Sequence, residues 1–68
     1  MSDGRCQGRV LEYDPERGYG RLQDSQERIF FVHYSDLIDE ETLKAGQAVK
    51  FEAVLHRKGN IARRVQVV

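Results

Sequence analysis

The 68-residue chain has one cysteine, two histidines and no long apolar run. Cys6 stands alone, so no internal disulfide can form and no metal site can rest on thiolates. The two histidines are far apart in sequence and indicate no metal site. No run approaches the roughly 18 apolar residues that a membrane span needs, and residues 1–4 lack the character of a signal peptide. We therefore expect a cytoplasmic protein without a membrane segment or a cofactor.

Net charge is also absent, because 11 Lys and Arg residues balance 11 Asp and Glu residues. This balance argues against a partner held by bulk electrostatics alone. The charges are nevertheless segregated: four carboxylates crowd into 36–41, whereas basic residues fall in or beside the strands predicted below. A composition of 40% hydrophobic and 32% charged residues indicates one small globular domain, which we expect over 5–68 after a disordered segment at 1–4.

The strongest pattern lies in residues 17–22 and 30–34, each of which alternates with the period of a β-strand. Pairing these two stretches gathers four side chains on one face: Tyr19, Arg21, Phe31 and His33. The opposite set is apolar and faces a core: Leu22, Phe30 and Val32. Aromatic residues on the wet face of a small sheet need an explanation, and rings flanked by Arg and His suit nucleobases and phosphates.

Five short strands are predicted, over about 5–13, 18–23, 28–33 and 47–55 and from residue 61 onward. Strict alternation in the first would bury Glu12 beside Val10, which is costly for an unpaired carboxylate, so we predict a bulge near Leu11-Glu12. Arg9, Leu11 and Tyr13 are expected to point outward.

A long link separates the third and fourth strands. We expect Ser35 or Asp36 to cap a short helical turn there, and residues 40–44 are a candidate for a second turn that ends at Gly46. Five strands with this link predict an all-β, five-stranded antiparallel OB-fold barrel, a fold that commonly binds oligonucleotides.

Collinear motifs along nearly the whole chain resemble the cold-shock domain family. They are Gly8-Arg9-Val10, Tyr13-Asp14, Arg17-Gly18-Tyr19-Gly20, Phe31-Val32-His33-Tyr34-Ser35 and the run from Gly46 to Glu52. The resemblance implies a protein that binds single-stranded RNA or DNA by base stacking, acts as an RNA chaperone, and has neither catalytic activity nor a small-molecule substrate.

The resemblance and the alternation together assign nucleic-acid binding to nine residues: Arg9, Tyr13, Arg17, Tyr19, Arg21, Phe31, His33, Tyr34 and Lys58. The aromatic residues and His33 are expected to stack bases, and Arg17 and Lys58 to contact phosphates. The alternative is structural, because aromatic side chains also form cross-strand clusters and surface cations are often merely solvated.

Several positions depart from the family's pattern. Glu12 replaces a tryptophan and would repel phosphate, Arg21 replaces a second aromatic, and Ile29 replaces an aspartate. The link after Leu37 is shorter and lacks a phenylalanine. The guanidinium of Arg21 can still stack and meet phosphate. Two platforms lost without replacement would weaken binding by about 2–6 kcal/mol.

Two other functions compete with nucleic-acid binding. In the first, the exposed aromatics and Leu11 form a homodimer or partner interface whose specifying charges are Glu12 and Arg21. In the second, His33 acts with Asp36 or Ser35 in an enzyme, which is disfavoured because so small a barrel encloses little pocket. The sequence does not decide whether RNA or DNA is the preferred ligand. It is compatible with a monomer or a weak homodimer.

Overall fold

The computed structural model describes residues 5–68, which form a closed five-stranded barrel. The elements are β1 (Cys6–Asp14), β2 (Tyr19–Asp24), β3 (Ile29–His33), the 3₁₀ turn η1 (Tyr34–Asp36), β4 (Ala48–Val54) and β5 (Asn60–Val67). The predicted all-β OB-type barrel is confirmed. The disorder predicted for residues 1–4 lies outside the described residues. Across residues 5–68, no helix is long and apolar enough to cross a membrane.

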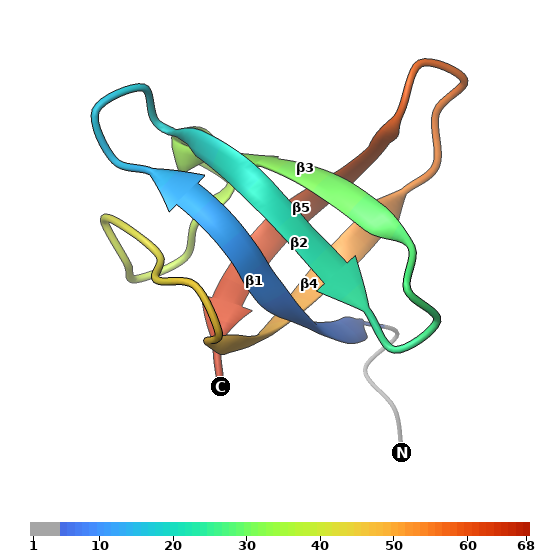
Figure 1. The fold of residues 1–68 in the computed structure, drawn as a ribbon, viewed down its shortest axis with the longest axis horizontal. Helices are drawn as coiled ribbons and strands as arrows, with labels where there is room; N and C mark the ends of the chain where they lie inside the picture. The colour runs from blue at the N-terminus through green and yellow to red at the C-terminus, as the bar shows by residue number, and fades with distance from the viewer. Residues whose placement is uncertain (1–4) are drawn as a thin grey trace.

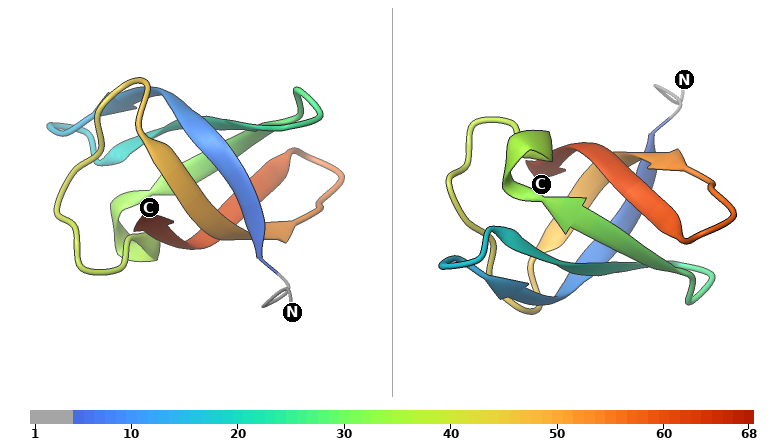
Figure 2. Two further views of the ribbon diagram at one scale, coloured as in Figure 1. Left: turned by 90° about the horizontal axis from the view of Figure 1, so that it is seen from below. Right: turned by 90° about the horizontal axis from the view of Figure 1, so that it is seen from above.

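The strands follow the order β1-β2-β3-β5-β4 around the barrel. Neighbours are antiparallel except β3 and β5, which close the barrel through a short parallel contact. In Figure 1, β1, β2 and β3 lie side by side in front, and β4 and β5 cross behind them. Figure 2 shows the long β3–β4 link looping out on one side of the barrel. One outward face therefore belongs to β1, β2 and β3 together.

A bulge in β1 occurs where the sequence predicts it. Val10 pairs with Leu22, but Glu12 pairs with Arg21, so Leu11 is the additional residue. Val10 keeps its place in the core at 2% exposure, and Glu12 faces solvent. The bulge thus resolves the conflict between alternation and the cost of burying a carboxylate.

The core is built from apolar side chains that the strands alternately turn inward, together with Leu43 of the β3–β4 link. It contains Val10, Leu22, Phe30, Val32, Leu43, Val49, Phe51, Ala62 and Val65. Phe30 and Phe51 meet edge to face, with ring centroids 5.0 Å apart. This packing joins the strands that carry the outward face to the rest of the barrel.

Two expectations for the β3–β4 link are wrong. Residues 40–44 are not helical, because the link must deliver Leu43 to the core, where it is 4% exposed. The 3₁₀ turn is capped by His33 and not by Ser35 or Asp36, since the His33 ring accepts the backbone N–H of Ser35. Burial of Leu43 therefore prevents a helical turn at residues 40–44. At the end of β3, the His33 ring nitrogen takes the capping role expected of Ser35 or Asp36.

Asp24 organises the turn between β2 and β3. Its Oδ1 accepts the backbone N–H groups of Gln26 and Arg28 at 2.9 and 2.8 Å, and its Oδ2 accepts Arg28 Nε at 2.8 Å. Burial raises the pKa of Asp24, but these hydrogen bonds outweigh it and hold the pKa below the ordinary value. The turn fixes the register of the two strands that carry the aromatic motifs.

Candidate nucleic-acid interface

Two rows of side chains cross the outward face of β1, β2 and β3. In strand register, the rows are Glu12–Arg21–Phe31 and Asp14–Tyr19–His33. Adjacent strands are about 4.8 Å apart, so each row is a nearly continuous strip across three strands. The structure brings together the four side chains that alternation assigns to one face.

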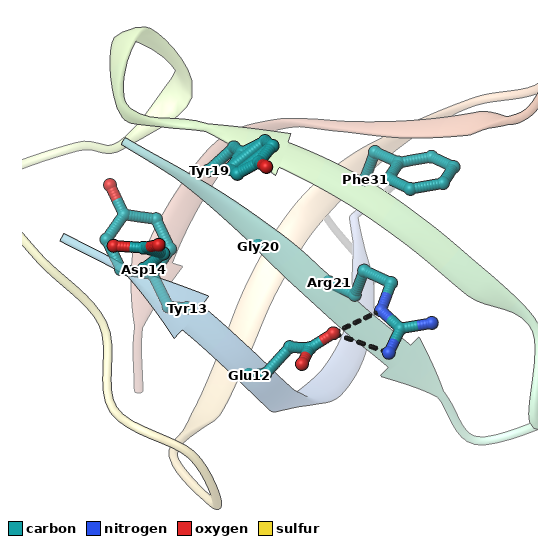
Figure 3. Close-up of a pocket in the computed structure, with 7 residues that line it drawn as sticks. All are labelled: Glu12, Tyr13, Asp14, Tyr19, Gly20, Arg21 and Phe31. Atoms are coloured by element: carbon teal, nitrogen blue, oxygen red, sulfur yellow. Dashed lines mark hydrogen bonds and ion pairs between the residues drawn. The ribbon is translucent and has the colours of Figure 1, made fainter. Parts of the chain in front are cut away.

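The rows border a hollow of about 470 Å³, drawn in Figure 3. It is lined by Glu12, Tyr13, Asp14, Tyr19, Gly20, Arg21 and Phe31. Gly20 lies between the two rows, and a Cβ there would stand only 2.2 Å from the backbone oxygen of Glu12. The close approach of β1 and β2 at the bulge therefore requires glycine at this position.

Three aromatic rings on this side are exposed: Tyr19 at 47%, Phe31 at 52% and Tyr34 at 60%. Two of them lie over glycines. A Cβ on Gly59 would come within 3.2 Å of the Phe31 ring, and one on Gly18, whose φ is 76°, within 2.6 Å of the Tyr34 ring. Glycine at these two positions therefore leaves room for the Phe31 and Tyr34 rings close to the backbone, while both rings stay exposed.

The imidazole of His33 is oriented by Ser35. Its Nδ1 lies 2.8 Å from Ser35 Oγ and accepts the Ser35 backbone N–H at 3.3 Å. In the neutral ring the proton is therefore on Nε2, which leaves an N–H donor for another partner. The ring also contacts Tyr34, with centroids 4.3 Å apart and planes inclined by 40°. His33 and Tyr34 form one tilted aromatic pair.

Arg17 and Tyr13 border the second row. Arg17 donates to the Tyr19 hydroxyl at 3.3 Å and lies 3.8 Å from Asp14, and the hydrogen bond to Tyr19 raises the pKa of Arg17. Tyr13 is half-buried against the core, and burial followed by the charge of Asp14 raises its pKa, so the phenol is neutral at pH 7. The outward direction expected for Tyr13 is only partly right: the side chain lines the hollow but also packs against the core, because the bulge at Leu11 shifts the phase of β1 by one residue.

Glu12 and Arg21 form an ion pair across β1 and β2. Arg21 donates to Glu12 Oε1 through Nε, at 2.6 Å, and through Nη2. The sequence motifs show that Glu12 stands where the family pattern has a stacking tryptophan. They do not predict its ion pair with Arg21. The available signal was the bulge, because a carboxylate displaced to the outward face there stands opposite Arg21.

Arg9 and Lys58 lie outside the hollow. Arg9 is exposed on β1 before the bulge, opposite Gln23. Lys58 is exposed in the β4–β5 turn and precedes Gly59, which contacts Phe31. No group of three His, Cys, Asp or Glu side chains within 5–68 is placed to hold a metal ion.

Comparison with known proteins agrees with this geometry. Residues 6–68 match the model of the 'Cold-shock' DNA-binding domain. The chain is 40% identical over 63 residues to the cold shock-like protein of Thermotoga maritima, covering 90% of this chain and 96% of the relative. It is 36% identical over 61 residues to the cold shock protein CspA of Staphylococcus aureus, covering 87% of this chain and 92% of that one.

The Drosophila Unr structure CSD456 has the same fold, with a TM-score of 0.76 at 20% identity. The alignment covers 94% of this chain and 26% of that one, so the chain spans about a quarter of the Unr fragment. The family match and the two bacterial relatives extend over most of the barrel. The chain therefore belongs to the cold-shock domain family, whose members are generally nucleic-acid-binding.

Proposed function

We propose that this protein binds single-stranded RNA or DNA on the β1–β2–β3 face and acts as a non-catalytic RNA chaperone in the cytoplasm. The observation that carries the proposal is the set of exposed rings, Tyr19, Phe31 and Tyr34, two of which lie on glycine backbone. Each base stacked on such a ring contributes about 1–3 kcal/mol, whatever the base.

The side chains divide into two roles. Tyr19, Phe31 and the His33–Tyr34 pair stack successive bases, while Arg9, Arg17 and Lys58 meet phosphates around them. Arg21 adds little net charge, because Glu12 neutralises it. Affinity is therefore weak to moderate and salt-dependent, with each neutralised phosphate adding about 0.7 to the log–log salt slope. Weak binding suits chaperoning, in which unpaired bases are held briefly and released.

The test is a titration of ¹⁵N-labelled protein with U₇ and dT₇ at two salt concentrations. Backbone amide chemical shifts monitor binding. Shifts should concentrate at Tyr19, Phe31 and His33 and shrink as salt rises, while Lys44 in the β3–β4 link serves as an internal control. No shift at millimolar ligand contradicts the proposal. Light scattering on the same samples measures the competing possibility, in which the exposed rings and Leu11 form a homodimer interface.

A further inference from the structure

The Glu12 carboxylate uses only half of its hydrogen-bonding capacity. Both Arg21 donors converge on Oε1, and Figure 3 shows the two dashed lines meeting at one oxygen. Within residues 5–68, Glu12 Oε2 and Arg21 Nη1 have no hydrogen-bond partner. The Glu12 side chain is 59% exposed and that of Arg21 47%, and both residues line the hollow, so the pair is accessible to a ligand there.

Asp14, the other carboxylate in the hollow, differs from Glu12. Its Oδ1 accepts the backbone N–H groups of Glu16 and Arg17 at 3.0 and 3.3 Å, and its Oδ2 lies 3.8 Å from Arg17 Nε. Both of its oxygens are thus engaged within the chain. Glu12 is the carboxylate that remains available for recognition.

The row that contains Glu12 pairs it with a stacking surface. Arg21 stands directly opposite Phe31, and Glu12 stands directly opposite Arg21. A base stacked on Phe31 can therefore direct its polar edge along the row. The guanidinium of Arg21 comes next in the row, and the carboxylate of Glu12 follows it. An ionised carboxylate only accepts hydrogen bonds and a guanidinium only donates them.

We propose, on the basis of the function proposed above, that Glu12 and Arg21 form a base-reading pair that selects guanine in single-stranded nucleic acid. The Watson–Crick edge of guanine carries an acceptor, O6, beside two donors, N1–H and the N2 amino group. O6 meets the guanidinium of Arg21, and the two donors meet the carboxylate of Glu12. Stacking on Phe31 supplies affinity, and the charged pair supplies selectivity.

The other bases fit this row less well. Cytosine and adenine each offer an amino group but no second adjacent donor. Uracil and thymine place two carbonyl oxygens around a single N–H, and one of these oxygens would face the carboxylate. The expected order of affinity is guanine, then cytosine and adenine, then uracil and thymine. Because the face is open to solvent, guanine should exceed uracil by about 5- to 20-fold, the lower part of the range for such contacts.

The experiment measures fluorescence anisotropy with labelled RNA heptamers that are all uridine except at the central base. That base is guanine, inosine, adenine, cytosine or uracil, at one moderate salt concentration. Inosine lacks the N2 amino group, so its affinity should fall below that of guanine. The ratio of the Kd for all-uridine to the Kd for the guanine heptamer is the readout, because stacking and phosphate contacts are common to both.

The decisive variant is Glu12→Gln. Arg21 can only donate, so the amide oxygen stays toward Arg21 and the amide NH₂ replaces the free acceptor. The ratio should fall to about one or invert in favour of uracil. Glu52→Gln is the matched control, because Glu52 is also an exposed glutamate in an arginine ion pair, 3.7 Å from Arg64 on the other side of the barrel. It should keep the wild-type ratio.

Amide spectra first establish that both variants are folded. Equal Kd values for all heptamers in wild type overturn the base-reading pair and leave nucleic-acid binding intact. The base-reading pair is also overturned if Glu12→Gln changes every Kd by one common factor, since that result indicates only general repulsion of phosphate. Failure of every heptamer to bind at millimolar concentration refutes the proposed function itself, and the base-reading pair with it.

Discussion

Phe30 and Phe31 are adjacent and chemically identical, yet the protein uses them differently. Phe30 is fully buried against Phe51, whereas Phe31 is 52% exposed over Gly59. Successive residues of a strand point to opposite faces, so one step along β3 passes from the core to the outward face. The pair separates two contributions that are hard to separate elsewhere: apolar burial that stabilises the barrel, and an exposed ring available to a ligand.

The same contrast applies to the differences from the family pattern. Glu12 and Arg21, which replace aromatics of that pattern, both lie on the outward face. The inward residues of these strands, Val10 and Leu22, remain apolar and buried. Outward positions can therefore change their chemistry at little cost to the fold, and ligand preference can change while the barrel persists.

The largest effect is expected from Phe30→Ala. Removing a fully buried phenylalanine costs about 3–5 kcal/mol of unfolding free energy. A domain of 68 residues has a total stability of only about 3–10 kcal/mol, so most of it would be lost. Urea unfolding followed by far-UV circular dichroism measures this loss. An unchanged midpoint would show that Phe30 does not support the core.

Phe31→Ala should give the complementary result. Its unfolding free energy is expected to change by less than about 1 kcal/mol, because half of the ring is already in water. Its affinity for single-stranded oligonucleotides should fall by about 1–3 kcal/mol, or roughly 5- to 150-fold. Anisotropy titration and urea unfolding on one sample give both values. A large loss of stability with unchanged affinity would reverse the roles of the two rings.

Asp24→Asn tests the turn that sets the register of β2 and β3. A slip of one residue would exchange the faces of Phe30 and Phe31. The folded-state pKa of Asp24 lies below the ordinary value of 3.8, so the ionised carboxylate stabilises the fold above about pH 4. That stability is lost as the pH falls through the folded pKa. The variant should therefore be less stable than wild type at pH 7, and the difference should shrink toward pH 2.

Thermal unfolding between pH 2 and pH 7 follows this difference. Glu27→Gln is the control, because Glu27 lies in the same turn and its carboxylate makes no ion pair within 5–68. A difference between Asp24→Asn and wild type that stays constant over the whole pH range would contradict a role for the charge of Asp24.

The barrel could be predicted from the sequence because its pattern is local. Alternation along β2 and β3 predicts the two strands. The cost of burying the Glu12 carboxylate predicts the bulge in β1. The direction of Tyr13 did not follow, because the phase beyond a bulge depends on which residue is the additional one, and cross-strand pairing decides that. The course of the β3–β4 link could not be predicted either, since the burial of Leu43 depends on tertiary contacts.

The site was predictable only in part, for a similar physical reason. Single residues such as Tyr19 and Phe31 could be placed on the outward face by counting along a strand. Interactions between elements could not: the Glu12–Arg21 ion pair depends on exact cross-strand register, and the contact of Gly59 with Phe31 depends on how the β4–β5 turn folds back toward β3.

The smallest effect is expected from Lys58→Gln, which tests whether the nucleic-acid interface extends beyond Phe31 to the β4–β5 turn. Lys58 precedes Gly59 at the edge of that ring and is exposed. If it neutralises one phosphate, its loss should lower the slope of log Kd against log salt by about 0.7 and weaken binding equally for all bases. Lys44→Gln, an exposed lysine in the β3–β4 link, should leave the slope unchanged. Equal slopes for wild type and both variants would confine the interface to the aromatic rows. The β4–β5 turn would then lie beside the Phe31 ring without contacting the nucleic acid.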